Sequence, residues 1–314
     1  MKGLIGASPA MQKICKEIEQ FAQNDLPVFI AGETGTGKDV CARTIHDLSP
    51  RAQKPFIALN CASLSEQFLE SELFGHVKGA YTGAMQARDG AVRRAQGGTL
   101  FLDEICDLPL SLQAKLLRFT ENYIYKKLGS DTPLRADIRI ICASNKDVKD
   151  QIKQGLFRED LYYRLCVGHI MMPPLRARGS DAIDIAQYYL MTQSVEKTLS
   201  NNVQEALLYY NWPGNIRELQ NILKLISQVP DNLIQIKHLP NEVRLKLMGK
   251  RKVDDGLTMS IGNQRLPYLP LRHTEKQAIK KALCLAGNNI PRAAAILDVA
   301  PSTLYRKIRL WEND

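Results

Sequence analysis

The amino-acid sequence predicts an α/β fold, in which a parallel sheet with helices on both faces precedes a small helical subdomain and a C-terminal all-α domain. Three observations support this prediction. Short apolar runs alternate with amphipathic segments through the first two thirds of the chain, which is typical of a parallel sheet between helices. A glycine-rich turn follows the first apolar run. A stretch without periodicity separates the last helical segments from the rest.

The individual elements follow from the spacing of apolar residues. Continuous apolar runs predict buried strands at residues 26–31, 55–59, 99–102, 139–143 and 167–172. Helical spacing predicts helices at residues 11–21, 39–48, 110–120 and 182–194. After Pro173 and Pro174 the strand pattern fades, and helical patterns at 203–210 and 215–228 indicate the helical subdomain.

These patterns divide the chain into four parts. The α/β subdomain is expected over residues 1–172, and the helical subdomain over residues 173–245. Residues 246–270 lose periodicity and gain Gly, Pro and charge, which predicts a linker. Residues 271–314 regain helical spacing and form the predicted C-terminal domain.

Length and composition argue against several classes of protein. A chain of 314 residues corresponds to about two domains. Hydrophobic residues at 45% and charged residues at 24% exclude wholesale disorder. No apolar run approaches the roughly 18 residues that a membrane span needs. The seven cysteines include no CxxC pair, which argues against a zinc ribbon or a disulfide framework. We therefore expect a cytoplasmic protein with no membrane partner.

The net charge of +9 is concentrated at the end of the chain. Lys and Arg nearly balance Asp and Glu as far as residue 245, whereas they outnumber them by about two to one beyond it. A basic segment of this kind favours a polyanionic partner, most simply nucleic acid, although a solvated tail without a partner is the alternative.

A phosphate-binding loop is predicted between the first strand and the next helix. Its glycines let backbone N–H groups turn towards phosphates, the helix N-terminus adds positive potential, and Lys38 supplies a cation. Asp39 stands where such loops usually carry Ser or Thr. An ordinary glycine-rich turn is the alternative interpretation. The expected nucleotide-binding residues are Gly32, Glu33, Thr34, Gly35, Thr36, Gly37, Lys38 and Asp39.

Two acidic residues end the apolar run at 99–102 and complete the predicted site. Asp103 is placed to hold Mg²⁺, directly or through water, and Glu104 to polarise the attacking water. Two acids after a strand could instead cap the next helix. Together with the phosphate loop, they predict a core that hydrolyses ATP or GTP.

The segment from Glu70 to His76 reads ESELFGH, and residues 79–84 read GAYTGA. These motifs resemble the signature of the sigma-54-dependent enhancer-binding activators, the NtrC-like branch of the AAA+ ATPases. Tyr81 stands where the family has Phe, and Asp39 where it has Glu. The resemblance implies ATP as the nucleotide and a sigma-54 contact through Gly79, Ala80, Tyr81, Thr82, Gly83 and Ala84.

The same resemblance implies roles for further residues. Asn60 matches the residue that restrains the catalytic glutamate, while Ser144 and Asn145 match the γ-phosphate sensor, in which Ser144 departs from the usual Thr. Arg158 and Arg164 match arginine fingers that enter a neighbouring subunit's site, and Arg217 matches the lid arginine that reads the nucleotide. Without the family, each arginine is typical of a surface ion pair. The implied assembly is a dimer on DNA and a hexameric ring when active.

The C-terminal segment resembles the Fis-type helix-turn-helix of these activators. Donor side chains gather on its second predicted helix, which suits contacts with phosphates and the major groove. A small three-helix interaction module is the alternative. Residues 289–307 are similar to the LuxO-like quorum-sensing subgroup of two-component regulators. The expected DNA-binding residues are Arg292, Ser302, Thr303, Tyr305, Arg306 and Lys307.

The expected function is therefore ATP-driven activation of RNA polymerase that holds sigma-54, from an enhancer site on DNA. A remodeller that acts on DNA directly is one alternative, and the loop at 79–84 argues against it. A repressor with nucleotide as a structural ligand is another, and Glu104 with both finger arginines argues against that. About five residues precede Gly6, so the family's N-terminal regulatory domain is not expected in this sequence.

Overall fold

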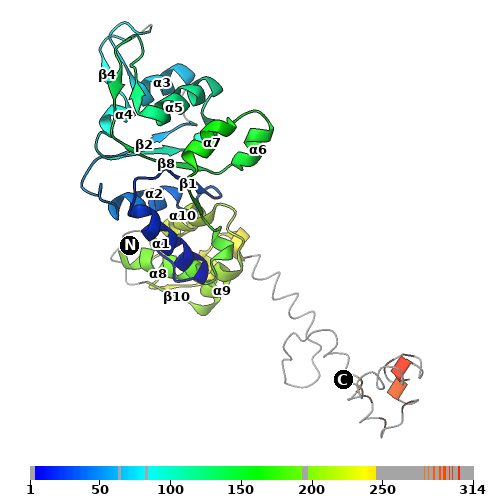
Figure 1. Cartoon of the computed structure of the whole chain (residues 1–314). Helices are drawn as coiled ribbons and strands as arrows, with labels where there is room; N and C mark the ends of the chain where they lie inside the picture. Colours follow the sequence, from blue (N-terminus) through cyan, green and yellow to red (C-terminus); the bar gives the residue numbers. More distant parts are fainter. Residues whose placement is uncertain are drawn as a thin grey trace. The chain divides into compact units, whose positions relative to one another are not determined.

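The computed structural model divides the chain into two compact units, residues 1–250 and 251–314. Figure 1 traces the chain through its helices and strands. The structure describes residues 4–62, 65–81, 84–192 and 197–244, together with isolated positions between 279 and 304.

A five-stranded sheet forms the centre of the first unit, and every neighbouring pair of its strands is parallel. This confirms the predicted sheet. The register sets Asn60 beside Asp103 at the carboxyl ends of two neighbouring strands. In spatial order the strands are β2 (Phe56–Asn60), β5 (Thr99–Asp103), β8 (Arg139–Ser144), β1 (Val28–Ala31) and β9 (Gly168–Met171).

Helices cover both faces of the sheet because alternate strand residues point to opposite sides. Val28 and Ile30 pack into one core with α1 and α2, whereas Phe29 packs into the other with α3, α4, α5, α6 and α7. The helices are α1 (Pro9–Ala22), α2 (Lys38–Asp47), α3 (Glu66–Phe74), α4 (Ala91–Arg94), α5 (Leu110–Asn122), α6 (Val148–Lys153) and α7 (Glu159–Leu165), with a 3₁₀ turn η1 (Ile105–Asp107) before α5.

Two short hairpins extend the α/β part of the chain. Val77 N–H donates to the carbonyl of Leu128 at 3.1 Å, and Leu128 N–H donates to the carbonyl of Gly75 at 2.9 Å, so the two hairpins are joined. Two-residue strands give no readable alternation, which is why the sequence did not predict them. The hairpins pair β3 (Gly75–His76) with β4 (Arg88–Asp89) and β6 (Ile124–Tyr125) with β7 (Leu134–Arg135).

A helical subdomain follows β9 and has its own apolar core. Trp212 lies at the centre of this core and donates its indole N–H to the carbonyl of Leu207 at 2.8 Å. The subdomain also contains one pair of short parallel strands, β10 and β11. Its elements are η2 (Leu175–Ala177), α8 (Asp181–Thr192), β10 (Thr198–Leu199), α9 (Asn201–Tyr209), α10 (Asn215–Ser227), β11 (Leu233–Ile234) and η3 (Ile236–His238).

The second unit is described only at isolated positions. Among them, Ile279, Ala282, Ala286, Ala293, Ala294 and Leu304 form a buried cluster. Ala293 and Ala294 are fully buried in it. Over the stretches that the structure describes in both units, no helix has the length and apolar character required to span a membrane.

The core of the helical subdomain can be tested with two leucines of the same helix. Leu223→Ala is expected to lower the free energy of unfolding by about 2–5 kcal/mol, because Leu223 is fully buried in α10 and its removal leaves a cavity. Leu225→Ala, at a position 62% exposed, is expected to change it by less than about 0.5 kcal/mol. Thermal and denaturant unfolding of both variants measures the difference. Equal losses would mean that α10 does not bury the face that carries Leu223.

Candidate active site

The phosphate loop joins β1 to α2, and its backbone is left-handed at Gly35 and Gly37, which favours glycine there. Gly37 precedes α2 with φ of +91°, in the left-handed region. Gly35 has φ of +77°, and a Cβ there would lie 2.4 Å from the carbonyl oxygen of Gly214. The loop therefore fits closely beneath the helical subdomain, and any larger residue at 35 would separate the two.

Lys38 begins α2 and its ammonium group is buried beside the loop. Its Nζ donates to the carbonyl oxygens of Gly32 at 2.9 Å and Glu33 at 3.3 Å. The same Nζ lies 3.8 Å from Oε1 of Glu104. The lysine thus links the phosphate loop to the acidic end of β5.

Asp103 and Glu104 stand at the carboxyl end of β5. Glu104 has a left-handed backbone with φ of +51°, uncommon for a residue other than glycine, and its N–H donates to Oδ1 of Asp103 at 3.0 Å. Burial raises the pKa of the Asp103 carboxyl, and the nearby negative charge of Glu104 raises it further. The two carboxyl groups therefore form a half-buried acidic pair.

The ends of β8 and β2 bring polar side chains to the same edge. The backbone N–H of Asn145 donates to Oε2 of Glu104 at 2.9 Å, and its side-chain amide donates to Oγ1 of Thr34 at 2.9 Å. Asn145 thus contacts both the acidic pair and the phosphate loop. The Oδ1 atom of Asn60 accepts from the N–H of Ala62 at 2.8 Å. Ser144 Oγ accepts from the N–H of Lys146 at 3.0 Å.

The residues present fit a magnesium ion that arrives with a nucleotide. Among the residues the structure describes, no three His, Cys, Asp or Glu side chains gather into a metal cage. Mg²⁺ commonly binds through one or two carboxylates together with substrate phosphates, so a cage is not required. A cation beside Asp103 would also favour the ionised form that burial and Glu104 disfavour.

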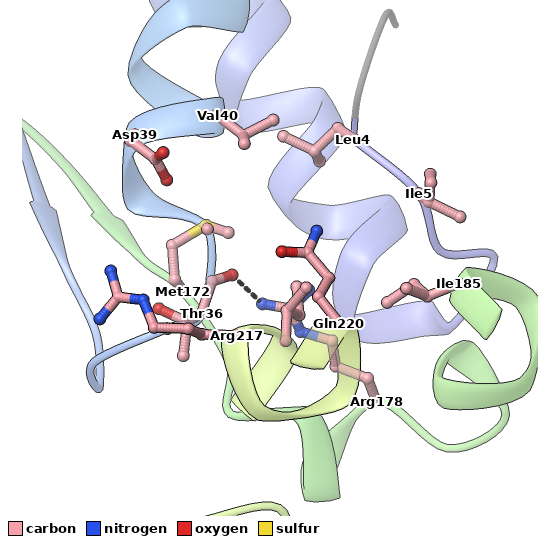
Figure 2. Close-up of a pocket in the computed structure, with 13 residues that line it drawn as sticks. Leu4, Ile5, Thr36, Asp39, Val40, Met172, Arg178, Ile185, Arg217 and Gln220 are labelled. Carbon is pink, nitrogen blue, oxygen red and sulfur yellow. Dashed lines mark hydrogen bonds between the residues drawn. The ribbon is translucent and has the colours of Figure 1, made fainter. Parts of the chain in front are cut away.

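A pocket lies beside the phosphate loop and opens between the two subdomains (Figure 2). Leu4 and Ile5 from the N-terminal segment and Ile216 from α10 give it apolar walls that could enclose a planar ring. The guanidinium of Arg178 donates to the carbonyl oxygen of Thr36 at 2.7 Å, as drawn in Figure 2. Arg217, on the first turn of α10, lines the same pocket.

Sequence reasoning missed Leu4, Ile5, Arg178 and Gln220 as lining residues of this pocket. No local pattern marks them, because they come together only when the N-terminal segment, the linker to α8 and α10 fold onto the loop. Arg217, by contrast, was predicted from the sequence; it lines the pocket, and its role towards the nucleotide stays a prediction.

Arg158 and Arg164 lie at opposite ends of α7 and are not among the residues that line this chain's own pocket. Arg158 is exposed and makes a bidentate ion pair with Asp160. Arg164 donates instead to the carbonyl oxygen of Thr120, through Nε at 3.1 Å and Nη2 at 2.9 Å. Arg158 is therefore bound by a surface carboxylate, whereas Arg164 is bound by a backbone carbonyl of α5.

The loop at residues 79–84 leaves the β3–β4 hairpin. The ring of Tyr81 packs edge-on against His76, with centroids 5.1 Å apart, and against Phe68 at 6.0 Å. Gly79 N–H donates to the carbonyl of Ala84 at 2.9 Å, which closes the base of the loop. Ala80 precedes Tyr81, whereas Thr82 and Gly83 lie outside the described residues.

Of the predicted DNA-binding residues, only Thr303 is described, as a half-buried helical residue. Arg292, Ser302, Tyr305, Arg306 and Lys307 lie outside the described residues.

Three family models match the chain in succession. The sigma-54 interaction domain matches residues 4–171, the AAA+ ATPase lid domain residues 176–254, and the Fis family of bacterial regulatory proteins residues 270–311. The last match confirms the helix-turn-helix part of the predicted fold.

Relatives align over nearly the whole chain. The sequence is 45% identical to the regulatory protein LuxO of Vibrio cholerae over 99% of this chain and 70% of LuxO. It is 38% identical to the DNA-binding transcriptional regulator NtrC of Azospirillum brasilense over 98% of this chain and 69% of NtrC. The crystal structure of NtrX from Brucella abortus in complex with ATP matches with a TM-score of 0.70 and 29% identity, over 98% of this chain and 69% of NtrX.

The acidic pair at the end of β5 predicts a measurable shift. Glu104→Gln is expected to lower the pKa of the Asp103 carboxyl, because it removes a neighbouring negative charge that opposes ionisation. Asp103 should then lose its proton at a lower pH than in the wild type, which an NMR titration of the carboxyl carbon measures. Asp107→Asn serves as the control, since Asp107 is not among the groups that shift Asp103. Shifts of equal size in both variants would contradict the pairing.

Proposed function

Because the chain belongs to the family of sigma-54-dependent transcriptional activators, we propose that it hydrolyses ATP to remodel RNA polymerase that holds sigma-54 and so opens the promoter. The observation that carries the proposal is the convergence of Lys38, Glu104 and Asn145 on one edge of the sheet. The matched sigma-54 interaction domain and Fis-type domain support the two macromolecular partners.

Hydrolysis requires a nucleophilic water, a bound phosphate and stabilisation of charge on the transferred group. The loop N–H groups and Lys38 bind the phosphates. Glu104 orients and polarises the water, and Asn145 positions the Glu104 carboxylate through its backbone N–H. Asn60 is proposed to restrain Glu104, and Ser144 with Asn145 to sense the γ-phosphate. Asp103, with Asp39 nearby, would hold Mg²⁺, which neutralises phosphate charge when bound.

ATP is the proposed nucleotide. The NtrX structure with ATP supports it, since that protein shares the fold at 29% identity. The pocket supplies an apolar enclosure for the base, and Arg217 lies beside the phosphate loop to report on the bound nucleotide.

Arg158 and Arg164 are proposed to act in the site of a neighbouring subunit. A guanidinium fork suits the charge that spreads over a phosphoryl group in the transition state. The position of both arginines outside their own pocket supports this assignment. A subunit would then depend on its neighbour for hydrolysis, and we propose a dimer on DNA that assembles into a hexameric ring.

The remaining parts of the chain receive the other partners. We propose that residues 79–84 contact sigma-54 and that residues 271–314 bind enhancer DNA through Arg292, Thr303 and Arg306 among others. Residues 1–172 and 173–245 form the ATPase body and its lid, and 246–270 the linker. The higher identity to LuxO than to NtrC supports the quorum-sensing subgroup, and a cytoplasmic location follows from the proposed partners.

The nucleotide chemistry separates into binding and hydrolysis. Lys38→Ala is expected to weaken ATP binding by about 10- to 100-fold, because it removes the ammonium group that lies in the loop and is proposed to bind phosphate. Glu104→Ala is expected to retain binding while hydrolysis falls by about 100-fold or more. Titration with a fluorescent ATP analogue and a phosphate-release assay measure the two quantities. Equal loss of binding in both variants would refute this division of roles.

Tyr81 tests whether hydrolysis is coupled to transcription. Tyr81→Ala is expected to leave ATP turnover within about twofold of the wild type and to abolish activation, because it removes the aromatic ring proposed to contact sigma-54. Tyr81→Phe keeps that face and should be nearly silent. Transcription from a sigma-54 promoter, with purified protein, ATP and an enhancer, provides the readout. Activation by Tyr81→Ala at wild-type levels would overturn the proposed contact, and no activation by the wild type would overturn the function itself.

A further inference from the structure

The contact between the phosphate loop and the lid is built around one buried amide. Asn215 is fully buried and holds a left-handed backbone with φ of +52° immediately at the start of α10. Its Oδ1 accepts from the N–H of Leu175 at 2.8 Å. Its Nδ2 donates to Oε2 of Glu33 at 3.1 Å and to the carbonyl oxygen of Thr34 at 3.0 Å. The side chain of Asn215 thus joins the phosphate loop, the segment after β9 that contains Leu175, and helix α10.

Glu33 extends this contact with its side chain. Its carboxylate accepts from both terminal nitrogens of Arg176 in the bidentate arrangement that carboxylates and guanidinium groups favour. The donors of Arg176 and Asn215 lower the pKa of Glu33 to about 2, so the carboxylate is ionised throughout the neutral range. The Glu33 side chain therefore bonds to residues of the helical subdomain, Arg176 and Asn215.

The backbone adds a third connection. Ile216 N–H donates to the carbonyl oxygen of Gly35 at 2.9 Å, and the absence of a Cβ at Gly35 permits the close approach of Gly214. The loop oxygens that face the lid are thus held by residues 215 and 216. Arg217 is the next residue along α10, so its position is set by these same bonds.

We propose that Glu33, Arg176 and Asn215 form a latch that positions α10, and with it Arg217, over the nucleotide bound in the phosphate loop. All three act here as positioning residues, because their side chains bond to one another and to the loop backbone and so act on the nucleotide through the loop and Arg217. The proposal rests on the proposed ATPase function. A change of the loop on nucleotide binding is transmitted to the lid through these three residues.

A double-mutant cycle on the ion pair tests the latch. Glu33→Gln and Arg176→Gln are each expected to raise the dissociation constant of a non-hydrolysable ATP analogue by about fivefold, a coupling typical of linked sites. The double variant should also show about a fivefold increase, because both changes break the same latch. Isothermal titration calorimetry measures the three dissociation constants.

The control is an ion pair of similar exposure that lies away from the loop. Asp47 pairs with Arg43 on α2, and their side chains are 43% and 56% exposed, against 44% and 46% for Glu33 and Arg176. Asp47→Asn should leave analogue binding unchanged. Hydrogen–deuterium exchange adds a readout independent of affinity. The analogue should protect the amide of Ile216 in the wild type and protect it less in the latch variants.

The outcomes separate the two proposals. Wild-type affinity in both single variants, or increases that multiply to about 25-fold in the double variant, would overturn the latch and leave the ATPase proposal intact. Unchanged protection of Ile216 in the variants would also overturn the latch. No analogue binding by the wild-type protein would overturn the proposed ATPase function and the latch together.

Discussion

The parallel register of the central sheet is the constraint on which the site depends. It brings the carboxyl ends of neighbouring strands to one edge, so that Asn60 lies beside Asp103. The phosphate loop leaves β1 at the same edge, and Asn145 follows β8 there and bonds to both Thr34 and Glu104. Each polar group comes from a different part of the chain. Their spacing is nevertheless set by the backbone hydrogen bonds of buried strands rather than by the side chains themselves.

Those strands could be predicted because they are short, apolar and bounded by clear breaks. Segments such as Val28–Ala31 and Thr99–Asp103 are largely buried on both faces, so their composition alone identifies them. The phosphate loop and acidic pair could be predicted for a similar reason, since each lies directly after such a strand. The roles of Arg158 and Arg164, of Asn145 and of residues 79–84 could be proposed only through the resemblance to a family.

Other parts of the site give no local signal. Glu33 and Arg176 are separated by 143 positions, and nothing around either residue indicates the other. Leu4 and Ile5 precede the first helix and line the pocket together with Ile185 and Ile216, which are far away in the sequence. The two-residue strands of the β3–β4 and β6–β7 hairpins are too short for periodicity. Contacts of this kind depend on tertiary packing and require the structure.

The hydrogen bond from Arg164 to the carbonyl of Thr120 links α7 to the end of α5, which are 44 residues apart in the sequence. Arg164 satisfies a carbonyl in the last turn of α5, and the chain passes directly from α5 into the hairpin whose Leu128 bonds to Val77, just before the loop that carries Tyr81. A neighbour that recruits Arg164 would withdraw that hydrogen bond and leave the end of α5 free to fray. Nucleotide binding at the site of one subunit would then favour release of the Tyr81 loop in the adjacent subunit, and release of that loop would favour nucleotide binding to the same extent.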